Sequence, residues 1–529
     1  MNNFKLKTIV AGVTLAIAQT ATAGTDVYFI PLTQSAAVAQ VPNHVNELNS
    51  PWQVPAGVSY TNLTSLHEIE ADANQSSVRV PGLGTGASMT DMSAFDPSGR
   101  YIFLPHETQY GAGVTRYDTK TDKATNLFKG DMNGATGNWA DDYGALDPAT
   151  WTPANTLLVG EEWSGEGRMF EIVNPMADVD AGETVIVNEL TNIPNVSIEG
   201  LQLNHDGTAI YFDDEDRSGS IYKFVPKKKG DYTKGQTFVL VVDGFTGDVT
   251  ANAGSYPNHN PQERTGMAHW EPMTDKNGNA LTTADPFDNA TRGGRAAADE
   301  LGGTPFRRPE DIEVGRLKNG HEAVYFTATE ELAVYSVEEL GDNKAYVRLA
   351  IDESSPKNVG FAATTGHLTS PDNLAQDALG NIYVIEDWPN GDNRGGDIWF
   401  LRDTDGDGAG ESLDHFMSLQ VKGAENTGMI FRPNHPTQFI VNIQHPESTS
   451  EWTTTNNGVV TVHPEGEGMG DATWLIDIKD VVAPPCADKK GGYRGYDRSD
   501  VKTCNEGDNS NFIEKLIKAE GGDKGRKHH

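Results

Sequence analysis

Acidic and amide side chains recur where short apolar segments of this 529-residue chain end. Each segment is β-branched or aromatic and follows a turn rich in Asp, Asn, Pro and Gly. If these segments are strands whose ends meet at one face, their carboxylates repel one another unless cations neutralise them. Oxygen ligands in such number favour a hard ion such as Ca²⁺, whereas for any single residue turn solvation is the simpler explanation. The residues at these ends are Glu107, Glu161, Glu162, Asp213, Glu386, Gln444 and His445.

A second acidic pattern runs from Asp403 to Asp414. Asp403, Asp405, Asp407 and Asp414 occupy positions 1, 3, 5 and 12 of a calcium-loop spacing, with Gly408 at position 6. The usual twelfth residue is Glu, and no amphipathic helix clearly flanks the segment. We interpret it as a structural calcium loop in a connection between strands; the alternative is a plain Asp/Gly turn.

The elements that must position these residues recur along the chain. The apolar segments end near residues 107, 161, 213, 330, 386 and 444, with gaps of 54, 52, 117, 56 and 58 residues. A repeat of about 50 residues built from several short strands is typical of a β-propeller. The double gap holds either a seventh, divergent blade or an insertion. Because residues 227–303 look loop-like, we predict an all-β, six-bladed propeller with a long insertion there.

Composition narrows the class of protein. Hydrophobic residues make up 37% of the chain, which is enough for a core and excludes general disorder. Acidic residues outnumber basic ones 76 to 41, giving a net charge of −35. Such a charge opposes binding to nucleic acid or to an anionic membrane, although it can also serve solubility alone.

The two ends of the chain carry further signals. Lys5 and Lys7, an apolar run and the small residues 21–23 form a signal peptide with cleavage after Ala23, which predicts a periplasmic or secreted protein without a membrane anchor. We expect the propeller over residues 24–480 and a tail over 481–529 that is helical near 511–519. In an oxidising compartment Cys486 and Cys504 favour one disulfide. A metal site on these thiols is less favoured, since neither has a second Cys or His at ligand spacing.

Several segments resemble the PhoX-type alkaline phosphatases, exported six-bladed propeller enzymes that carry calcium and iron. The resemblance covers about residues 95–450 in order. Its strongest motifs are Glu425-Asn-Thr-Gly, Asn442-Ile-Gln-His-Pro and Thr304-Pro-Phe-Arg-Arg-Pro-Glu310. Weaker matches are Pro105-His-Glu107, Ser197-Ile-Glu199-Gly and Ser370-Pro-Asp372.

The resemblance implies roles at the matched positions. Glu199 and Glu310 would be carboxylates of the iron pair, and Arg308 would face the substrate phosphate. The remaining metal ligands that it implies are Glu107, Glu161, Glu162 and Glu425. Gly160 stands where the family has its iron-binding cysteine, and the leader lacks a twin-arginine pair. We therefore expect calcium more than iron.

The function that follows is a metal-dependent phosphatase, acting as a monomer on small-molecule phosphoesters. Two alternatives stay open. One is a non-catalytic, calcium-stabilised propeller that binds a ligand or partner. The other is a different hydrolase on the same scaffold, such as a phytase or a lactonase, since a fold alone does not name a reaction.

Overall fold

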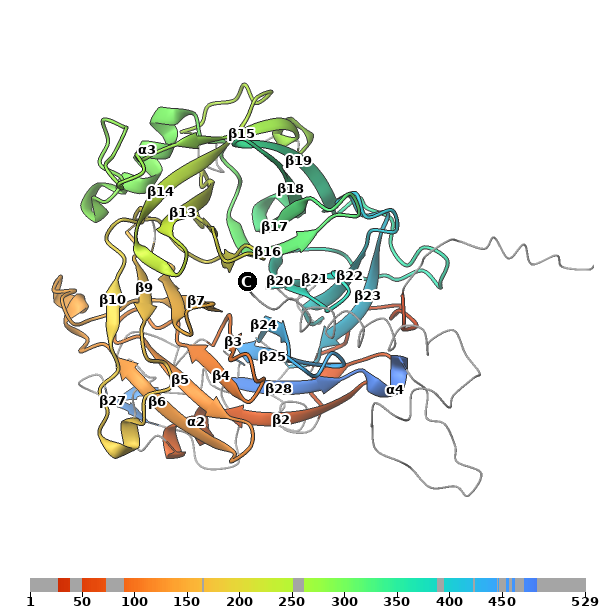
Figure 1. Cartoon of the computed structure of the whole chain (residues 1–529). Helices are drawn as coiled ribbons and strands as arrows, with labels where there is room; N and C mark the ends of the chain where they lie inside the picture. Colours follow the sequence, from red (N-terminus) through yellow and green to blue (C-terminus); the bar gives the residue numbers. More distant parts are fainter. Residues whose placement is uncertain are drawn as a thin grey trace, which may run out of the picture.

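The computed structural model describes residues 27–38, 50–72, 90–163, 166–250, 261–387, 394–421, 424–444, 446, 453–455, 459–461 and 471–482. The expected signal peptide, the helical tail, His445, Cys486 and Cys504 lie outside these residues. The fold is an all-β, propeller-like ring of antiparallel sheets with few helices (Figure 1).

Four sheets of the ring are separate. One contains β3 (Ala94–Phe95), β4 (Tyr101–Pro105), β5 (Gly113–Asp118) and β6 (Lys123–Lys129). The next contains β7 (Leu146–Trp151), β8 (Leu157–Glu161), β9 (Met169–Ile172) and β10 (Val187–Glu189). A third contains β20 (Pro371–Gln376), β21 (Ile382–Glu386), β22 (Asp397–Arg402), β23 (Ser412–Leu419) and β1 (Trp52–Gln53). The fourth contains β24 (Glu425–Phe431), β25 (Gln438–Gln444), β28 (Ala472–Asp477) and β2 (Ser59–Ser65).

Between the second and third of these lies a nine-stranded sheet. Its first run is β11 (Leu201–Leu203), β12 (Ile210–Asp213), β13 (Ile221–Lys228) and β14 (Asp231–Val242). Its second run is β16 (Pro309–Arg316), β17 (Glu322–Ala328), β18 (Ala333–Gly341) and β19 (Lys344–Asp352). The strand β15 (Gly266–Pro272) pairs with β14 on one side and β19 on the other and so joins the two runs.

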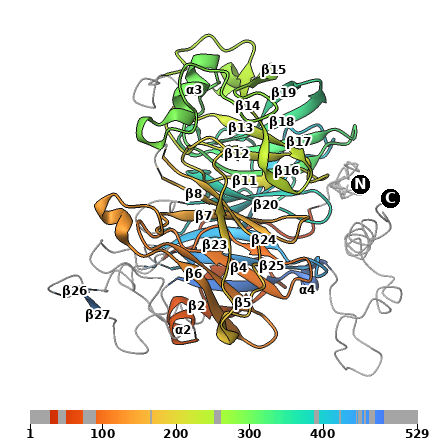
Figure 2. The same cartoon turned by 60° about the vertical axis from the view of Figure 1, so that its left-hand side comes forward.

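The remaining elements are short. A separate hairpin contains β26 (Thr453–Thr455) and β27 (Val459–Thr461). The described α-helices are α2 (Leu66–Asp72), α3 (Gly293–Leu301) and α4 (Lys479–Val482), and α2 and α3 lie at opposite edges of the ring (Figure 2). No helix in the described part of the chain is long and apolar enough to cross a membrane. The 3₁₀-helices are η1 (Asn133–Thr136), η2 (Val179–Ala181), η4 (Pro261–Arg264), η5 (Asn289–Thr291) and η6 (Thr329–Glu331).

The first strand of each run lies nearest the centre. Figure 1 shows this for β3, β7, β16, β20 and β24, and β11 packs between β7 and β16. The ring closes where the Thr427 hydroxyl donates to the Thr90 carbonyl at 3.0 Å and Asn442 Nδ2 donates to the Asp91 carbonyl at 2.6 Å. The N-terminal strand β2 also completes the last sheet by pairing with β28.

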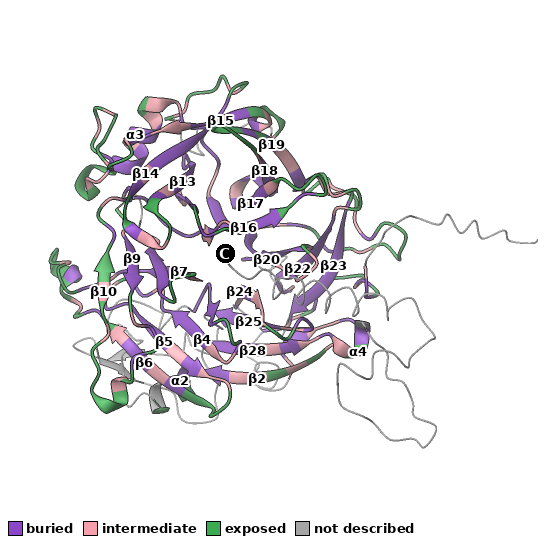
Figure 3. Cartoon of the chain, in the orientation of Figure 1, coloured by how far each residue is buried: buried purple, intermediate pink, exposed green. Residues whose placement is uncertain are grey.

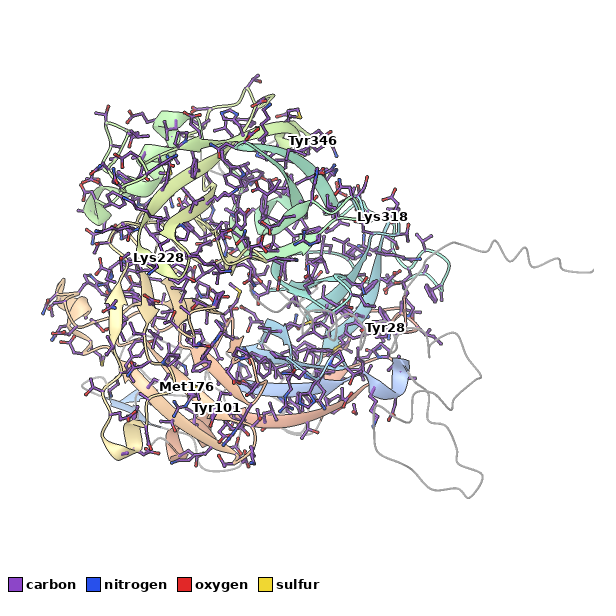
Figure 4. All side chains as sticks on the ribbon, viewed as in Figure 1. Tyr28, Tyr101, Met176, Lys228, Lys318 and Tyr346 are labelled. Carbon is purple, nitrogen blue, oxygen red and sulfur yellow. The ribbon has the colours of Figure 1, made fainter. Side chains whose placement is uncertain are left out.

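Alternation along the strands sends apolar side chains between neighbouring sheets. Phe103, Leu157 and Phe170, for example, are buried together between the first two sheets. Strands near the centre are buried over most of their length, and exposed residues gather on outer loops (Figure 3). On the periphery, Met176 and Tyr346 lie on different sides of the ring and are 43% and 36% exposed (Figure 4).

The expectation of a loop-like insertion over 227–303 is wrong in part. Residues 231–242 form the longest strand of the nine-stranded sheet, residues 266–272 form β15, and residues 293–301 form α3. The segment Phe238-Val-Leu-Val-Val242 is apolar and β-branched, and it pairs with β13 and β15 on its two edges. The neighbouring turn residues concealed this strand in the sequence.

Candidate metal centre

Three inner strands carry an acidic residue at a β-bulge near their first residue. The pairing register shifts between Leu146 and Ala149 in β7, between Pro309 and Ile312 in β16, and between Pro371 and Leu374 in β20. A bulge bends its strand and redirects a side chain, and bulges are common beside functional sites. The acidic residues within these bulges are Asp147, Glu310 with Asp311, and Asp372.

The redirected carboxylates meet in two overlapping clusters. Oxygen atoms of Asp147, Glu162 and Glu199 lie within 4.8 Å of one another. The same limit holds for Glu199, Glu310 and Asp372, so Glu199 belongs to both clusters. Within the described structure, one oxygen of Glu199 and both oxygens of Glu310 are buried and accept no hydrogen bond. Such a concentration of unsatisfied, buried carboxylate oxygens is a cation-binding arrangement.

A further group of carboxylates adjoins these clusters. Gln444 Nε2 donates to Glu107 Oε2 at 3.0 Å and to Asp91 Oδ2 at 3.3 Å. Burial, and after it the charges of Glu425 and Asp311, raises the pKa of Asp91. Glu107 and Glu425 therefore belong to the same carboxylate-rich centre as Asp91.

Burial, and after it repulsion between neighbouring carboxylates, raises the pKa values of residues in this centre. Burial raises the pKa of Glu199, and the neighbouring charges of Glu310 and Asp372 raise it further. Burial and the charge of Glu310 raise the pKa of Glu215 to about 7. Burial and the charge of Glu425 raise the pKa of Asp387 to about 9. These carboxylates ionise together only when positive charge is supplied.

Arg308 is the cation that the structure places among them. Its Nε hydrogen-bonds to Glu215 and lies 3.1 Å from Glu310 Oε1. Burial lowers the pKa of Arg308, but the charges of Glu310 and Glu215 outweigh burial and raise it. Its φ of 51° lies in the left-handed region, which L-residues rarely adopt and which recurs at ligand-binding positions.

At the strand ends, one carboxylate of each neighbouring pair enters the centre and the other binds residues of the sheet. Glu161 accepts from Arg168 at 2.7 and 2.8 Å, while the next residue, Glu162, enters the centre. Glu386 likewise accepts from Trp399 Nε1 at 2.9 Å, whereas the next residue, Asp387, belongs to the centre. Successive side chains of a strand point to opposite faces, so a difference of one position determines whether a carboxylate enters the centre or faces the sheet.

Asp213 belongs to neither carboxylate cluster. Its Oδ1 accepts from the amide of Gly200 at 2.7 Å and from the amide of Glu199 at 3.3 Å, so it orients the segment that carries Glu199. Sequence reasoning did not assign a role to several residues of the centre. They are Asp91, Asp147, Glu215, Asp372 and Asp387. A proline beside the acid could have found two of them, Asp147 in Asp147-Pro148 and Asp372 in Pro371-Asp372, as in the predicted Pro309-Glu310.

The predicted calcium loop takes a different form. Oxygens of Asp403, Asp405 and Glu411 lie within 4.8 Å of one another, so Glu411 stands where Asp414 was expected. Asp414 lies inside β23, where Arg402 Nη2 donates to it at 2.7 Å. Asp407 accepts from the amide of Ala409 at 2.9 Å. The oxygens of Asp403 already accept from loop amides, including those of Gly406 and Gly408 at 2.7 Å.

Gly160 lies in β8 with no space for a side chain. A Cβ built there would be 2.5 Å from Ile198 Cγ2 and 3.0 Å from Pro148 Cγ. A thiolate at this position would require β8 or Ile198 to move. All the side chains assigned above to the centre, apart from Arg308, offer oxygen atoms.

The sequence model of the family described as alkaline phosphatase PhoX matches residues 167–447. PhoX from Pseudomonas fluorescens, solved with vanadate as a transition-state analogue, superposes with a TM-score of 0.56 at 16% identity, covering 87% of this chain and 98% of that one. No curated protein sequence matches the chain.

Other solved structures are more distant. A protein of unknown function from Bacteroides thetaiotaomicron has a TM-score of 0.37 at 9% identity over 79% of this chain and 76% of its own. The calcium-binding protein regucalcin from Agrobacterium tumefaciens has a TM-score of 0.36 at 12% identity over 73% of this chain and 89% of its own.

Proposed function

The chain belongs to the alkaline phosphatase PhoX family, and from this we propose that its carboxylate centre is the site of phosphoester hydrolysis. As a member it is a metal-dependent phosphatase. The observation that carries the placement is the pair of clusters sharing Glu199, because they gather buried oxygens that accept no hydrogen bond beside the cation Arg308. The family match does not favour the alternatives of a non-catalytic propeller, a phytase or a lactonase.

We assign the metal ligands to the residues of the two clusters and their neighbours. Asp147, Glu162 and Glu199 would hold one ion, and Glu199, Glu310 and Asp372 a second. Asp91, Glu107 and Glu425 would complete the shell on the other side. Glu161 is left out because its carboxylate is engaged by Arg168.

The donor set supports calcium. Ca²⁺ takes six to eight oxygen ligands in flexible geometry, and the assigned residues are carboxylates. An iron pair held by a thiolate has no support from Gly160, whose surroundings leave no space for a sulfur atom. When bound, the ions would neutralise the centre and polarise the phosphoryl group.

Arg308 is suited to hold the phosphate. Its Nε is engaged by Glu215, while Nη1 and Nη2 have no hydrogen-bond partner among the described residues. A guanidinium edge can donate to two phosphate oxygens at once. Glu215 and Glu310 keep the group charged and fix its direction, so it meets the phosphate with little loss of entropy.

The proposal also covers the number of blades, the bounds of the propeller, export and the oligomeric state. We count the runs β11–β14 and β16–β19 as two blades, which gives six with the four separate sheets. The propeller would span residues 24–480, with a short Asp403–Glu411 loop as a minor structural cation site. Export after cleavage at Ala23, a monomeric state, and a tail closed by Cys486 and Cys504 complete the proposal.

The test is turnover of a phosphomonoester by purified protein with metals added back. We expect chelation to abolish phosphate release and Ca²⁺ to restore it, with bound metal measured by elemental analysis. In the Ca²⁺-loaded protein, Arg308→Ala should lower kcat/KM at least 100-fold, since a lost bidentate contact to phosphate costs about 3 kcal/mol.

Arg217→Ala is the matched control. Arg217 is half exposed, pairs with Glu330, and should be replaceable without loss of activity. Equal activity of wild type and Arg308→Ala would contradict the placement of the phosphate. A wild type that releases no phosphate with any metal would contradict the proposed function.

A further inference from the structure

Three aromatic side chains lie together, and two of them follow residues of the carboxylate centre closely in the sequence. Ring centroids are 5.4 Å apart for Tyr110 and Trp139, 5.8 Å for Tyr110 and Trp163, and 5.5 Å for Trp139 and Trp163. Trp163 directly follows the centre residue Glu162, and Tyr110 lies three residues after Glu107. We refer to Tyr110, Trp139 and Trp163 as the aromatic platform.

Arg168 and two glycines hold Trp139 of the platform in place. Arg168 pairs with Glu161, donates from Nη1 to the Trp139 carbonyl at 3.1 Å, and lies 5.8 Å from the Trp139 ring. Trp139 also packs against two glycines: a Cβ at Gly134 would be 2.6 Å from its ring, and a Cβ at Gly144 would be 3.1 Å away. The Glu161–Arg168 pair thus supports Trp139 where sequence reasoning expected a metal ligand.

The exposure of the platform is not explained by packing. All three rings are only half-buried, whereas aromatic side chains between the sheets are buried. Aromatic rings that stay accessible beside a polar site provide a stacking surface with an apolar face. Rings held rigidly lose little entropy when a ligand stacks on them.

Charge around the platform limits what it can bind. Asp131 and Asp141 are exposed on the loop that carries Trp139, and exposed Glu166 donates its amide to the Trp163 carbonyl at 2.6 Å. These carboxylates disfavour a ligand with negative charge beyond the phosphate that enters the centre. The surface therefore suits an uncharged, planar organic group.

We propose that the aromatic platform binds the planar aromatic part of the substrate, so that the protein prefers phosphomonoesters of nucleosides or phenols over those of aliphatic alcohols. This specificity role rests on the proposed phosphatase function of the adjacent centre. Stacking of a nucleobase or phenyl ring on the platform would lower KM for such esters. The phosphate would then lie toward Arg308.

The kinetic test compares three substrates: adenosine 5′-monophosphate, phenyl phosphate and glycerol 1-phosphate. Wild type should show higher kcat/KM for the two aromatic esters. In Trp139→Ala and Trp163→Ala, the ratio of kcat/KM for an aromatic ester to that for glycerol 1-phosphate should fall on the order of tenfold, mainly through KM. Trp163→Phe should retain most of the ratio. The aromatic ester whose ratio falls, adenosine 5′-monophosphate or phenyl phosphate, identifies the group that the platform recognises.

Tyr101→Ala is the matched control, because Tyr101 is a half-buried tyrosine of β4 outside the platform (Figure 4). It should leave the ratio unchanged. An unchanged ratio in the folded tryptophan variants would overturn the proposal. Because the ratio is taken within one preparation, partial unfolding does not affect it.

A binding measurement separates this inference from the proposed function. Adenosine or phenol should quench tryptophan fluorescence of the wild type saturably, without metal or phosphate. Tyr110→Ala keeps both platform tryptophans and should raise the Kd at least fivefold. Saturable quenching in a protein that hydrolyses no ester would refute the phosphatase function but support the platform. Normal hydrolysis without quenching or substrate preference would refute the platform alone.

Discussion

Glu199 is the residue on which the carboxylate centre depends most, because it belongs to both ligand clusters. Its side chain is 4% exposed, and one oxygen accepts no hydrogen bond in the described structure. Without a cation, a charge at this position is opposed by burial and by Glu310 and Asp372, which together raise its pKa. The same charge becomes favourable once a metal ion occupies the cluster.

Glu199→Gln should therefore act in opposite directions with and without metal. In chelator, the amide removes repulsion, and the melting temperature should rise by a few degrees. In Ca²⁺, the variant should bind less metal, melt below the wild type and lose activity at least 100-fold. Differential scanning calorimetry in both conditions measures this.

Glu353→Gln provides the comparison for that experiment. Glu353 is exposed, so its replacement should shift neither melting temperature by more than about 1 °C. A Glu199→Gln variant that is destabilised equally in chelator and in Ca²⁺ would show that Glu199 has a structural role only.

At the scale of elements, α3 shows how the segment between β14 and β16 supports the centre. Arg295 of α3 donates from Nε to Asp214 Oδ2 at 2.7 Å, and its Nη1 lies 2.9 Å from Asp216 Oδ2. These two acids flank Glu215, the partner of Arg308, and the Asp216 carbonyl accepts from the Arg308 amide at 3.0 Å. Thus α3 orients Arg308, the arginine proposed to bind phosphate, through Asp214 and Asp216.

Arg295→Ala should consequently reduce both stability and activity. It leaves Asp214, which is 0% exposed, without its cation, and breaking a buried pair in this way costs about 3 kcal/mol. We expect KM for a phosphomonoester to rise more than kcat falls, as Arg308 loses its orientation. Urea denaturation and steady-state kinetics measure the two effects.

Replacing both Arg295 and Asp214 distinguishes the effect of an unpaired buried charge on stability from the effect of Arg295 on the orientation of Arg308. Arg295→Met combined with Asp214→Asn removes the unpaired charge and should regain much of the stability but not the low KM. Arg292→Ala, at a half-exposed arginine just before α3, should have little effect on stability. A normal KM in Arg295→Ala would contradict the positioning role.

Over the whole molecule, buried carboxylates gather where the sheets meet. The net charge of −35 includes a ring of buried carboxylates contributed by every sheet of the ring. Glu215, with a pKa of about 7, and Asp387, with a pKa of about 9, are protonated in the folded, metal-free protein at pH values where the unfolded chain has lost those protons. The folded state then binds more protons, so its stability falls as pH rises.

We therefore expect the metal-free protein to melt at progressively lower temperature from about pH 5 to about pH 9. Ca²⁺ should raise the melting temperature by an increment that grows over the same window, because metal binding requires ionised carboxylates. Thermal melts in chelator and in Ca²⁺ at each pH provide the measurement. A Ca²⁺ increment that is zero, or constant with pH, would exclude a carboxylate metal centre.

The sequence alone determined the class of fold and the chemistry of the site. Turn-and-strand repeats of about 50 residues require an all-β ring, and acidic residues at strand ends require a face with carboxylates. The structure brings Glu107, Glu162, Glu199, Glu310 and Arg308 together, and their roles as metal ligands and as the phosphate-binding arginine stay predictions. These inferences depend on local patterns, which a sequence displays directly.

Only the tertiary structure decided which acid of each strand end enters the centre. Glu161 and Glu162 are neighbours in sequence, yet one pairs with Arg168 and the other joins a carboxylate cluster, because side chains alternate between faces and the register fixes that alternation. The bulges that redirect Asp147 and Asp372 arise from pairing between strands. Pairing is a non-local property, so no single strand's sequence contains it.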